Sequence, residues 1–483
     1  MYLFFVFDLY LKIYNLIPKA LFTIGFNFLE KILQNIFYTA EILLFLLFED
    51  LTNINIESES GWTLLELAIE IENTKIVNHL ICKGANLNFL SSSGWTPLSY
   101  AIYKNNFKTV ELLITSGDTN INNSVSYWWT VMTTAIEMDS IETVKLLIEK
   151  SNNGDLNVTN SYGCSPFTLA ISNNREEIAK VLIEKGTNVD FDDQANWTPL
   201  SVAIGYDNID MVKFLIEKGA NLDFKNKAGW TPLTKAIDYN RQEIIEFLIE
   251  KGADMNLMDI AGLTPLNRAI SFNRIEIVKT LIDKGADIDL PDGDGWTPLT
   301  RAIMMDMIDM TKVLIQNGAD VNLPDGEHYT PLINAIILDR LEIVKVLIEK
   351  GADINLVDNM NWIPLTCAIK FKRKEIVNIL IASGANLDIR TNGGNIPLSE
   401  AVSEKNLDVV KLLVENGASI NIHDGGGGTP FQNAVIKKHM EIVTFLMKNG
   451  ADLKLKTKHV RYNSIELSLK GNTIDIMKKL IYH

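Results

Sequence analysis

The sequence contains few of the residues on which disulfide bonding, metal binding and catalysis depend. Only three of its 483 residues are cysteines, Cys82, Cys164 and Cys367, and none belongs to a Cys-x-x-Cys pair. An odd number of widely separated cysteines predicts neither disulfides nor a zinc site, and it indicates a reducing compartment such as the cytoplasm. The six histidines share no metal-ligand spacing, and the glycine run 425–428 lacks the Lys-Ser/Thr of a phosphate loop. We therefore expect no metal, no cofactor and no enzymatic activity.

Positive charge is also in short supply. Lysine and arginine together number 45 against 60 acidic residues, which gives a formal net charge of −15. Proteins bind nucleic acid non-specifically by neutralising phosphates with Lys and Arg, so we expect no nucleic-acid partner. A short basic run at residues 454–459 is interpreted as a solvated loop.

Long uncharged hydrophobic runs are absent, even from the apolar N-terminal segment of residues 1–48. Charged residues interrupt this segment at Asp8, Lys12, Lys19, Glu30, Lys31 and Glu41. No uncharged stretch reaches the roughly 18 residues that a membrane span needs, and no basic region precedes the apolar one as in a signal peptide. Three interpretations remain: a helical cap on the repeats that follow, an amphipathic segment that contacts a membrane surface or a partner, and a poorly folded extension from a start codon placed too early.

What the chain does contain is a repeat. The stretch Gly94-Trp95-Thr96-Pro97-Leu98 returns at residues 229–233 and 295–299, and Trp62 and Trp95 are separated by 33 residues. The equivalent position falls on Trp62, Trp95, Trp129, Cys164, Trp197, Trp230, Leu263, Trp296, Tyr329, Trp362, Asn395 and Gly428. Two steps are longer, at 34 and 35 residues, and their insertions fall in the polar stretches 120–124 and 151–155. A fixed period of this size predicts a stacked repeat architecture.

The unit at residues 325–356 illustrates the structure that the pattern predicts. Thr330 and Pro331 favour a helix start, because Thr caps the first turn and Pro has no N–H to satisfy there. Leu332, Ala335 and Ile336 then form an apolar stripe at helical spacing. Asp339 and Arg340 indicate a sharp turn, and a second helix follows with residues 343, 344, 347 and 348 inward. Gly351 ends that helix in the left-handed conformation.

This pattern resembles the ankyrin repeat. Thr-Pro-Leu, the following Ala (for example Ala236 and Ala335) and the Gly-Ala-Asp/Asn of residues 219–221 and 285–287 stand in the register of that family. The resemblance implies an all-α solenoid of helix-turn-helix units with short hairpin loops, which acts as a non-catalytic scaffold for protein–protein interaction. The chain departs from the family where a His usually follows Thr-Pro-Leu, which bears on a hydrogen bond that tethers the next loop. The residues found there include Ser99, Thr234, Asn267, Ile333 and Gln432.

The register divides the chain into twelve full units between two partial ones. We expect an apolar N-terminal segment ending in a capping half-repeat at 1–58, repeats 1 to 12 at 59–88, 92–121, 126–157, 161–190, 194–223, 227–256, 260–289, 293–322, 326–355, 359–388, 392–421 and 425–454, and a truncated C-terminal capping repeat at 459–483. Terminal repeats are expected to be atypical because they cover the ends of the core.

In the ankyrin family two positions line a concave groove: the residue before Thr-Pro-Leu and the residue nine further on. Carried onto this sequence, these columns are apolar or aromatic together over repeats 5 to 10. The candidate pairs are Trp197 with Tyr206, Trp230 with Tyr239, Leu263 with Phe272, Trp296 with Met305, Tyr329 with Leu338, and Trp362 with Phe371. The pairs Asn395–Glu404 and Gly428–Lys437 make the far end polar. Contiguous apolar surface marks interaction sites, although Trp at this position also packs on the neighbouring turn.

An arginine column lies just beyond the second of these positions, at Arg175, Arg241, Arg274, Arg340 and Arg373. These side chains either pair with carboxylates of a partner or bind loop carbonyls and acidic neighbours within the fold.

Our prediction is a monomeric scaffold with a protein partner. Two alternatives stay open: a recruiter anchored to a membrane through residues 1–48, and a substrate-recruiting subunit of an enzyme complex. The composition, rich in Ile, Asn and Lys, resembles ankyrin proteins of AT-rich intracellular bacteria and large DNA viruses, which implies a host-directed role and secretion into a host cell.

Overall fold

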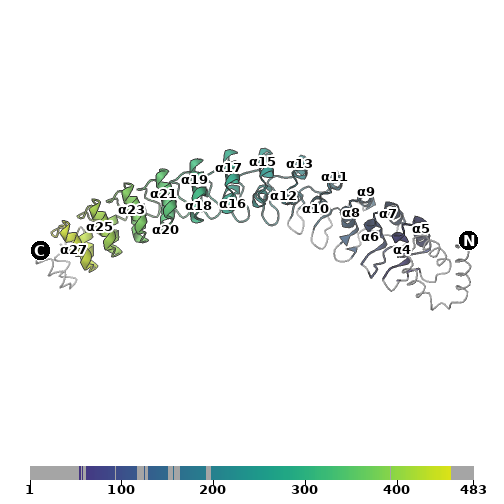
Figure 1. Cartoon of the computed structure of the whole chain (residues 1–483), viewed down its shortest axis with the longest axis horizontal. Coiled ribbons are helices and arrows are strands. Elements are labelled where there is room, and N and C mark those ends of the chain that lie inside the picture. Colours follow the sequence, from purple (N-terminus) through teal and green to yellow (C-terminus); the bar gives the residue numbers. More distant parts are fainter. Residues whose placement is uncertain are drawn as a thin grey trace, which may run out of the picture. The chain divides into compact units, whose positions relative to one another are not determined.

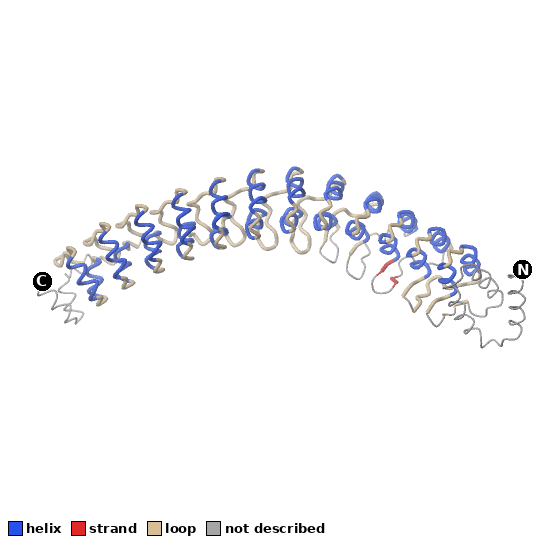
Figure 2. Tube along the Cα trace, in the orientation of Figure 1, coloured by secondary structure: helices blue, strands red, loops and turns tan. Residues whose placement is uncertain are grey.

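The computed structural model describes residues 61–92, 94–116, 131–150, 164–191, 197–391 and 393–457, together with residues 54–55, 57, 124–125, 129–130 and 156. The N-terminal segment 1–48 and the C-terminal partial repeat 459–483 lie outside these residues. The chain divides into two compact units, residues 1–228 and residues 229–483. Each unit is a stack of helix pairs (Figures 1 and 2).

The first unit contains helices α4 to α13. Their bounds are α4 Leu64–Glu70, α5 Thr74–Cys82, α6 Pro97–Tyr103, α7 Phe107–Thr115, α8 Val131–Glu137, α9 Ile141–Lys150, α10 Pro166–Ser172, α11 Glu176–Glu184, α12 Pro199–Gly205 and α13 Ile209–Glu217. The described strands, β1 Ser124–Val125 and β2 Trp129–Thr130, pair antiparallel in the loop before α8. Strand structure in the described residues is therefore confined to a hairpin, as an all-α solenoid predicts.

The second unit contains helices α14 to α27. Their bounds are α14 Pro232–Asp238, α15 Gln242–Glu250, α16 Pro265–Ser271, α17 Ile275–Asp283, α18 Pro298–Met304, α19 Ile308–Gln316, α20 Pro331–Ile337, α21 Leu341–Glu349, α22 Pro364–Lys370, α23 Lys374–Ala382, α24 Pro397–Ser403, α25 Leu407–Glu415, α26 Pro430–Ile436 and α27 Met440–Lys448. Each first helix packs on the second helix of its own pair and on the first helix of the next pair. The expected solenoid is confirmed within each unit.

The Thr-Pro signal starts the first helices as the sequence predicts. In α20 the Thr330 hydroxyl accepts a hydrogen bond from Ile333 N, and Pro331 occupies the first turn. In α14 a capping box adds the reverse bond, in which Thr231 N donates to the hydroxyl of Thr234 at 2.9 Å. Ser and Thr after Thr-Pro-Leu therefore satisfy backbone groups at the helix start.

Two of the other residues that replace the family His still tether a loop. The Gln432 amide donates to the carbonyl oxygen of Leu455 at 2.6 Å, and the Asn267 amide reaches Trp296 O of the next repeat at 3.4 Å. At these two positions an amide side chain therefore replaces the His and still makes a hydrogen bond that tethers the loop.

Left-handed residues make the two sharp turns of repeat 9. Asp339 lies between α20 and α21 with φ of 60°, and Gly351 follows α21 with φ of 92°. Asp and Asn tolerate this region better than most residues, and Gly adopts it without steric cost. Both turn predictions for this unit are confirmed.

In repeat 9, more residues of the two helices are buried than the single apolar stripe expected on each. In α20 every residue from Pro331 to Ile336 is buried, because this helix is covered by α21 and by first helices on both sides. In α21 the expected Ile343, Val344 and Leu347 are buried, but Ile348 is only half-buried and Val346 is buried in its place. The second helices also pack on one another, so burial extends beyond the stripe that faces α20.

The hairpin tips of repeats 7 to 9 stack backbone on backbone. Gly293 N donates to Gly262 O, and Gly326 N donates to Gly295 O, both at 2.7 Å. A Cβ on Gly293 would lie 2.9 Å from Gly262 Cα, which is closer than non-bonded atoms approach. These tips therefore have no room for a side chain at the stacking position. Within the described residues, no helix is long and apolar enough to cross a membrane.

Candidate partner-binding surface

Aspartate-centred turns hold the backbone of the first aromatic column in the second unit. Asp292 Oδ1 accepts hydrogen bonds from Asp294 N and Trp296 N, both at 3.0 Å. Asp358 does the same for Met360 N at 2.9 Å and Trp362 N at 2.7 Å. Because a carboxylate stabilises a tight turn by accepting such bonds, each column residue leaves its turn in a fixed direction just before the helix cap.

The first-column residues are all half-buried. This holds for Trp197 in the first unit and, in the second unit, for Trp230, Leu263, Trp296, Tyr329 and Trp362. These side chains therefore belong neither to the core nor to the fully exposed surface. Each packs on the protein with one side and is accessible to solvent on the other.

The second-column residues are more exposed and occupy the C-caps of the first helices. In the first unit, Tyr206 is 65% exposed. In the second unit, the exposed fractions are 40% for Tyr239, 46% for Phe272, 42% for Met305 and 40% for Phe371, while Leu338 is half-buried. Four large apolar side chains at C-caps of the second unit, which the core does not use, form the most accessible part of the predicted surface there: Tyr239, Phe272, Met305 and Phe371.

The structure brings members of the two columns together in some repeats. The rings of Trp362 and Phe371 lie 6.1 Å apart between centroids. Trp230 and Tyr239 share a cation, because the Lys235 ammonium lies 5.3 Å from the first ring and 5.0 Å from the second. Burial of Lys235 among these groups lowers its pKa.

A third column, of basic residues, lies beside the two apolar columns and was not predicted from the sequence. Lys235, Arg268 and Arg301 each follow Thr-Pro-Leu by two positions, and all three approach aromatic rings. The Arg268 guanidinium lies 3.6 Å from the Trp230 ring centroid, and that of Arg301 lies 5.1 Å from the Trp296 centroid. The signal was present in the sequence as three basic residues at one 33-residue register position.

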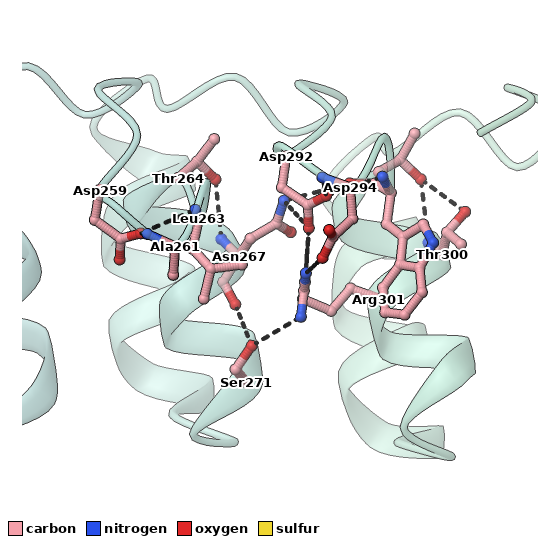
Figure 3. Close-up of polar contacts among 12 residues, drawn as sticks. Asp259, Ala261, Leu263, Thr264, Asn267, Ser271, Asp292, Asp294, Thr300 and Arg301 are labelled. Carbon is pink, nitrogen blue, oxygen red and sulfur yellow. Dashed lines mark hydrogen bonds and ion pairs between the residues drawn. The ribbon is translucent and has the colours of Figure 1, made fainter. Parts of the chain in front are cut away.

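Acidic partners fix these arginines. Arg268 donates to Asp259 Oδ2 at 2.7 Å and to both carboxylate oxygens of Asp238, at 2.6 and 2.9 Å. Arg301 instead donates through two nitrogens to one oxygen, Asp292 Oδ2, and also reaches the Ser271 hydroxyl (Figure 3). Burial still raises the pKa of Asp238, although the Arg268 hydrogen bonds and charge oppose this effect. Arg268 therefore connects α14, α16 and a hairpin turn.

In repeat 10 the position that corresponds to Arg268 and Arg301 is occupied by Cys367. The Asp358 Oδ2 atom is buried and has no hydrogen-bond partner, and the Cys367 side chain is fully buried. Burial raises the pKa of Asp358, and burial together with the Asp358 charge raises the pKa of the Cys367 thiol to about 12. A thiol is a weak donor, so this repeat lacks the strong donor found in repeats 7 and 8.

Three residues of the arginine column bind within the fold. Arg340 pairs with Asp306 at 3.0 Å, and Arg373 pairs with Asp339 at 3.2 Å and donates to Ile337 O at 2.8 Å. In the first unit, Arg175 pairs with Asp139 and donates to Glu137 O. For these three arginines, the interpretation that they bind carbonyls and acidic neighbours within the fold is confirmed.

The far end of the second unit is polar at both columns. Lys370 pairs with Glu404 at 2.8 Å and with Glu400 at 3.4 Å. The hydrogen bond and charge of Lys370 lower the pKa of Glu404. Within the part of the chain that the structure describes, no group of three or more His, Cys, Asp or Glu side chains is arranged to hold a metal ion.

The first unit carries a separate aromatic cluster in repeats 1 and 2, outside the repeats in which the candidate pairs lie. Tyr100 on α6 lies 4.8 Å from Trp62 and 6.1 Å from Trp95 between ring centroids, and Trp95 lies 5.0 Å from Tyr103. The Tyr100 hydroxyl donates to Glu70, and burial together with this carboxylate raises the pKa of Tyr100. Tyr100 occupies the register position of Lys235, so the third column contributes here as well.

Comparison with known proteins gives a consistent result. A family model described as ankyrin repeats (3 copies) matches residues 34–124, 117–194, 185–259, 252–325, 323–391 and 383–457. No curated protein matches the chain. Among solved structures, the chain is similar to the ankyrin repeat domain of Bcl-3, a member of the IkappaB protein family. The two are 24% identical with a TM-score of 0.42, over 45% of this chain and 96% of that one. Since the family model covers most of the sequence, the chain belongs to the ankyrin repeat family.

Proposed function

We propose that the protein is a non-catalytic scaffold that binds a protein partner through the two apolar columns, which cover repeats 6 to 10 in the second unit and, taken by itself, repeat 5 in the first. Ankyrin repeats generally mediate protein–protein interaction, which supports the scaffold. The observation that carries the proposal is the exposure of the second column, where Tyr239, Phe272, Met305 and Phe371 stand at 40–46%. Exposed apolar surface of this kind is typical of interaction sites.

The fold does not account for these side chains. The inward positions of the same helices are occupied by other residues, such as Leu266, Ala269 and Ile270 on α16, each at most 1% exposed. A helix C-cap needs no aromatic ring, and polar Glu404 and Lys437 occupy the position in repeats 11 and 12. The preformed surface would cost little ordering entropy on binding.

The test is a triple substitution of Tyr239, Phe272 and Phe371 by Ala in the full chain. Because each ring is exposed, we expect the melting temperature to change little, whereas a partner should bind more weakly by about 1–2 kcal/mol per anchor. Proteins captured by the wild-type chain are identified by mass spectrometry, and their capture by the variant is then measured.

The matched control substitutes three exposed apolar residues outside the columns. Leu90, Ile260 and Ile436 are 51%, 74% and 56% exposed, and their replacement by Ala should leave both capture and melting temperature near wild type. A collapse of stability in the Tyr239, Phe272 and Phe371 variant would mean that the columns are core packing. Equal capture by the two triple variants would place the binding surface elsewhere.

A further inference from the structure

Two members of the arginine column in the second unit pair with a turn residue of the preceding repeat. Arg340 pairs with Asp306 at 3.0 Å, and Arg373 pairs with Asp339 at 3.2 Å. Each aspartate stands 34 positions before its arginine and is the left-handed residue between the two helices of its repeat. Because the same spacing gives the same contact twice, the register of the repeats brings this arginine and this turn residue together.

Arg274 in repeat 7 stands in the same register but has no acidic partner. The residue 34 positions before it is Asn240, which is exposed and left-handed with φ of 57°, but which carries no charge. Within the part of the chain that the structure describes, the Arg274 side chain takes part in no hydrogen bond or ion pair. Arg274 is therefore a cation that the fold positions and does not neutralise.

The end of the Arg274 guanidinium is accessible from outside the protein. The Nε atom is buried without a partner in Arg274, as it is in Arg340 and Arg373, and all three residues are half-buried. The three side chains therefore pack alike along their stems. In Arg340 and Arg373 the Nη1 atom carries the ion pair, and these side chains are 32% and 29% exposed. The Nη groups of Arg274 correspondingly lie at the surface, where a partner can reach them.

Arg274 adjoins the exposed apolar columns of repeats 6 and 7. It follows Phe272 by two residues, and Phe272 and Tyr239 are 46% and 40% exposed. Other positive charges border the same rings, since the Lys235 ammonium lies 5.0 Å and the Arg241 guanidinium 6.0 Å from the centroid of the Tyr239 ring. This part of the columns is thus bordered by cations, although the net charge of the chain is −15.

We propose that Arg274 binds a carboxylate of the protein partner, namely an Asp or Glu side chain in a segment whose apolar residues pack on Tyr239 and Phe272. This inference rests on the proposed function, because it adds one specificity contact to the apolar columns. A guanidinium binds a carboxylate through two parallel hydrogen bonds, which fixes the orientation of the bound segment. The net charge of −15 disfavours a strongly acidic partner, so a single acidic residue within an apolar segment fits this surface.

The chain itself supplies the variants that test the contact. Arg274→Met removes the charge and keeps an apolar stem, and Arg340→Met is its matched control, because Asp306 already occupies that guanidinium. Asn240→Asp blocks the contact by the opposite route, since the new carboxylate should pair with Arg274 as Asp306 pairs with Arg340. Asp306 and Asp339 hold the same turn position with φ of 59° and 60°, so the fold accepts this change. Circular dichroism verifies that each variant is folded.

The probe is a random peptide library displayed on phage and selected on the intact full-length protein. Peptides that lose affinity for the Tyr239, Phe272 and Phe371 triple variant are the column binders, and we expect them to share an acidic residue at one position. One such peptide is synthesised with Glu at that position and with Gln, which has the same shape without the charge. The Glu form should bind Arg274→Met and Asn240→Asp about tenfold more weakly than wild type and Arg340→Met as tightly as wild type. The Gln form should bind all four proteins alike; tenfold corresponds to about 1.4 kcal/mol.

The outcomes separate this inference from the function on which it rests. Column binders without an acidic residue, or a Glu peptide that binds Arg274→Met as tightly as wild type, would overturn the Arg274 contact and leave the apolar columns as the binding surface. An equal loss of affinity for Arg340→Met would also overturn it, because a general effect of positive charge would then explain the result. A library that yields no binder, or only binders that tolerate the triple variant, would contradict the proposed surface and this contact with it.

Discussion

At the scale of single residues, the turn aspartates combine two tasks that are usually separate. One oxygen fixes the backbone of the first column, and the other is balanced by a donor from the first helix, as with Asp325 and Asn334. A substitution nine residues away therefore alters the charge balance without disturbing the turn. In repeat 10 this position is occupied by Cys367, and replacing it allows the effect of a missing donor on stability to be measured directly.

We expect Cys367→Asn to stabilise the protein. The new amide would donate to Asp358 Oδ2 as Asn334 does to Asp325, and a satisfied buried acceptor is worth about 1 kcal/mol. Urea denaturation measures the gain. Cys367→Ala is the control, since it removes the thiol and supplies no donor. If Asn and Ala variants unfold at the same urea concentration, Asp358 is not limited by a missing donor.

The same carboxyl should make stability depend on pH. Burial raises the pKa of Asp358 in the folded protein above its ordinary value of 3.8. At a pH between the ordinary pKa and the raised one, the folded state therefore holds more protons than the unfolded state. The contribution of Asp358 is therefore favourable at low pH and is lost as pH rises through the folded pKa. Relative to wild type, Asp358→Asn should become progressively more stable over that range.

The measurement is the difference in unfolding free energy between Asp358→Asn and wild type from pH 3 to pH 7, in which the other carboxyl groups cancel. A difference that stays constant with pH would mean that Asp358 titrates normally in the folded protein.

At the scale of elements, Arg268 joins parts that the 33-residue repeat keeps separate. Its side chain binds Asp238 at the end of α14 and Asp259 in the hairpin before α16, and it covers the Trp230 ring. The stack of repeats 6 and 7 is thus held by a charged cluster as well as by apolar packing.

Arg268→Met should therefore destabilise the second unit by about 3–5 kcal/mol, because it leaves two carboxylates of low exposure without their cation. Arg340→Met is the matched control. Its ion pair with Asp306 is largely exposed, so the loss should stay below about 1 kcal/mol. Chemical denaturation compares the two, and similar losses would show that the Arg268 cluster contributes no more than a surface pair.

The helices were largely predictable from sequence because their signals are local. Thr330 and Pro331 mark a helix start within two residues, and Gly351 marks an end. The third column was not predicted, because a lysine or arginine on a short helix is equally compatible with solvent. Its role depends on Asp238 and Asp259, which lie 30 and 9 residues from Arg268 and approach it only in the stack. Full burial of α20 likewise follows from its neighbours rather than from its own periodicity.

At the scale of the whole molecule, the repeats differ in how closely they keep the shared pattern of a Pro at the helix start and a length of 33 residues. Val131 starts α8 where most first helices start with Pro, and one insertion in the register precedes this repeat while the other lies near its end. In the second unit, by contrast, Pro starts every first helix from α14 to α26. A solenoid is stabilised by each repeat and by its neighbours, so a weak repeat opens without the rest of the stack.

Hydrogen exchange should therefore be faster over residues 118–165 than over residues 225–355. Trp128 stands where most other repeats have Gly, and the remaining ones Asn or His, before the first column, and a bulky residue adopts positive φ less readily than these. Mass spectrometry of peptides from the two regions measures the exchange. Equal protection would indicate that the insertions and the missing Pro carry no local cost.

The stacked hairpin tips of repeats 7 to 9 have a consequence for how the sequence can evolve. Loop tips ordinarily accept substitutions freely, yet Gly262, Gly293, Gly295 and Gly326 touch backbone to backbone, where any side chain collides. A substitution at any of these four glycines therefore needs a different arrangement of the neighbouring tip, as where Ile260 stacks on Gly229, whereas the exposed column residues can change one at a time. New partners would therefore arise in this lineage through the helical face, and the most exposed loops of these repeats would be among its slowest-changing positions.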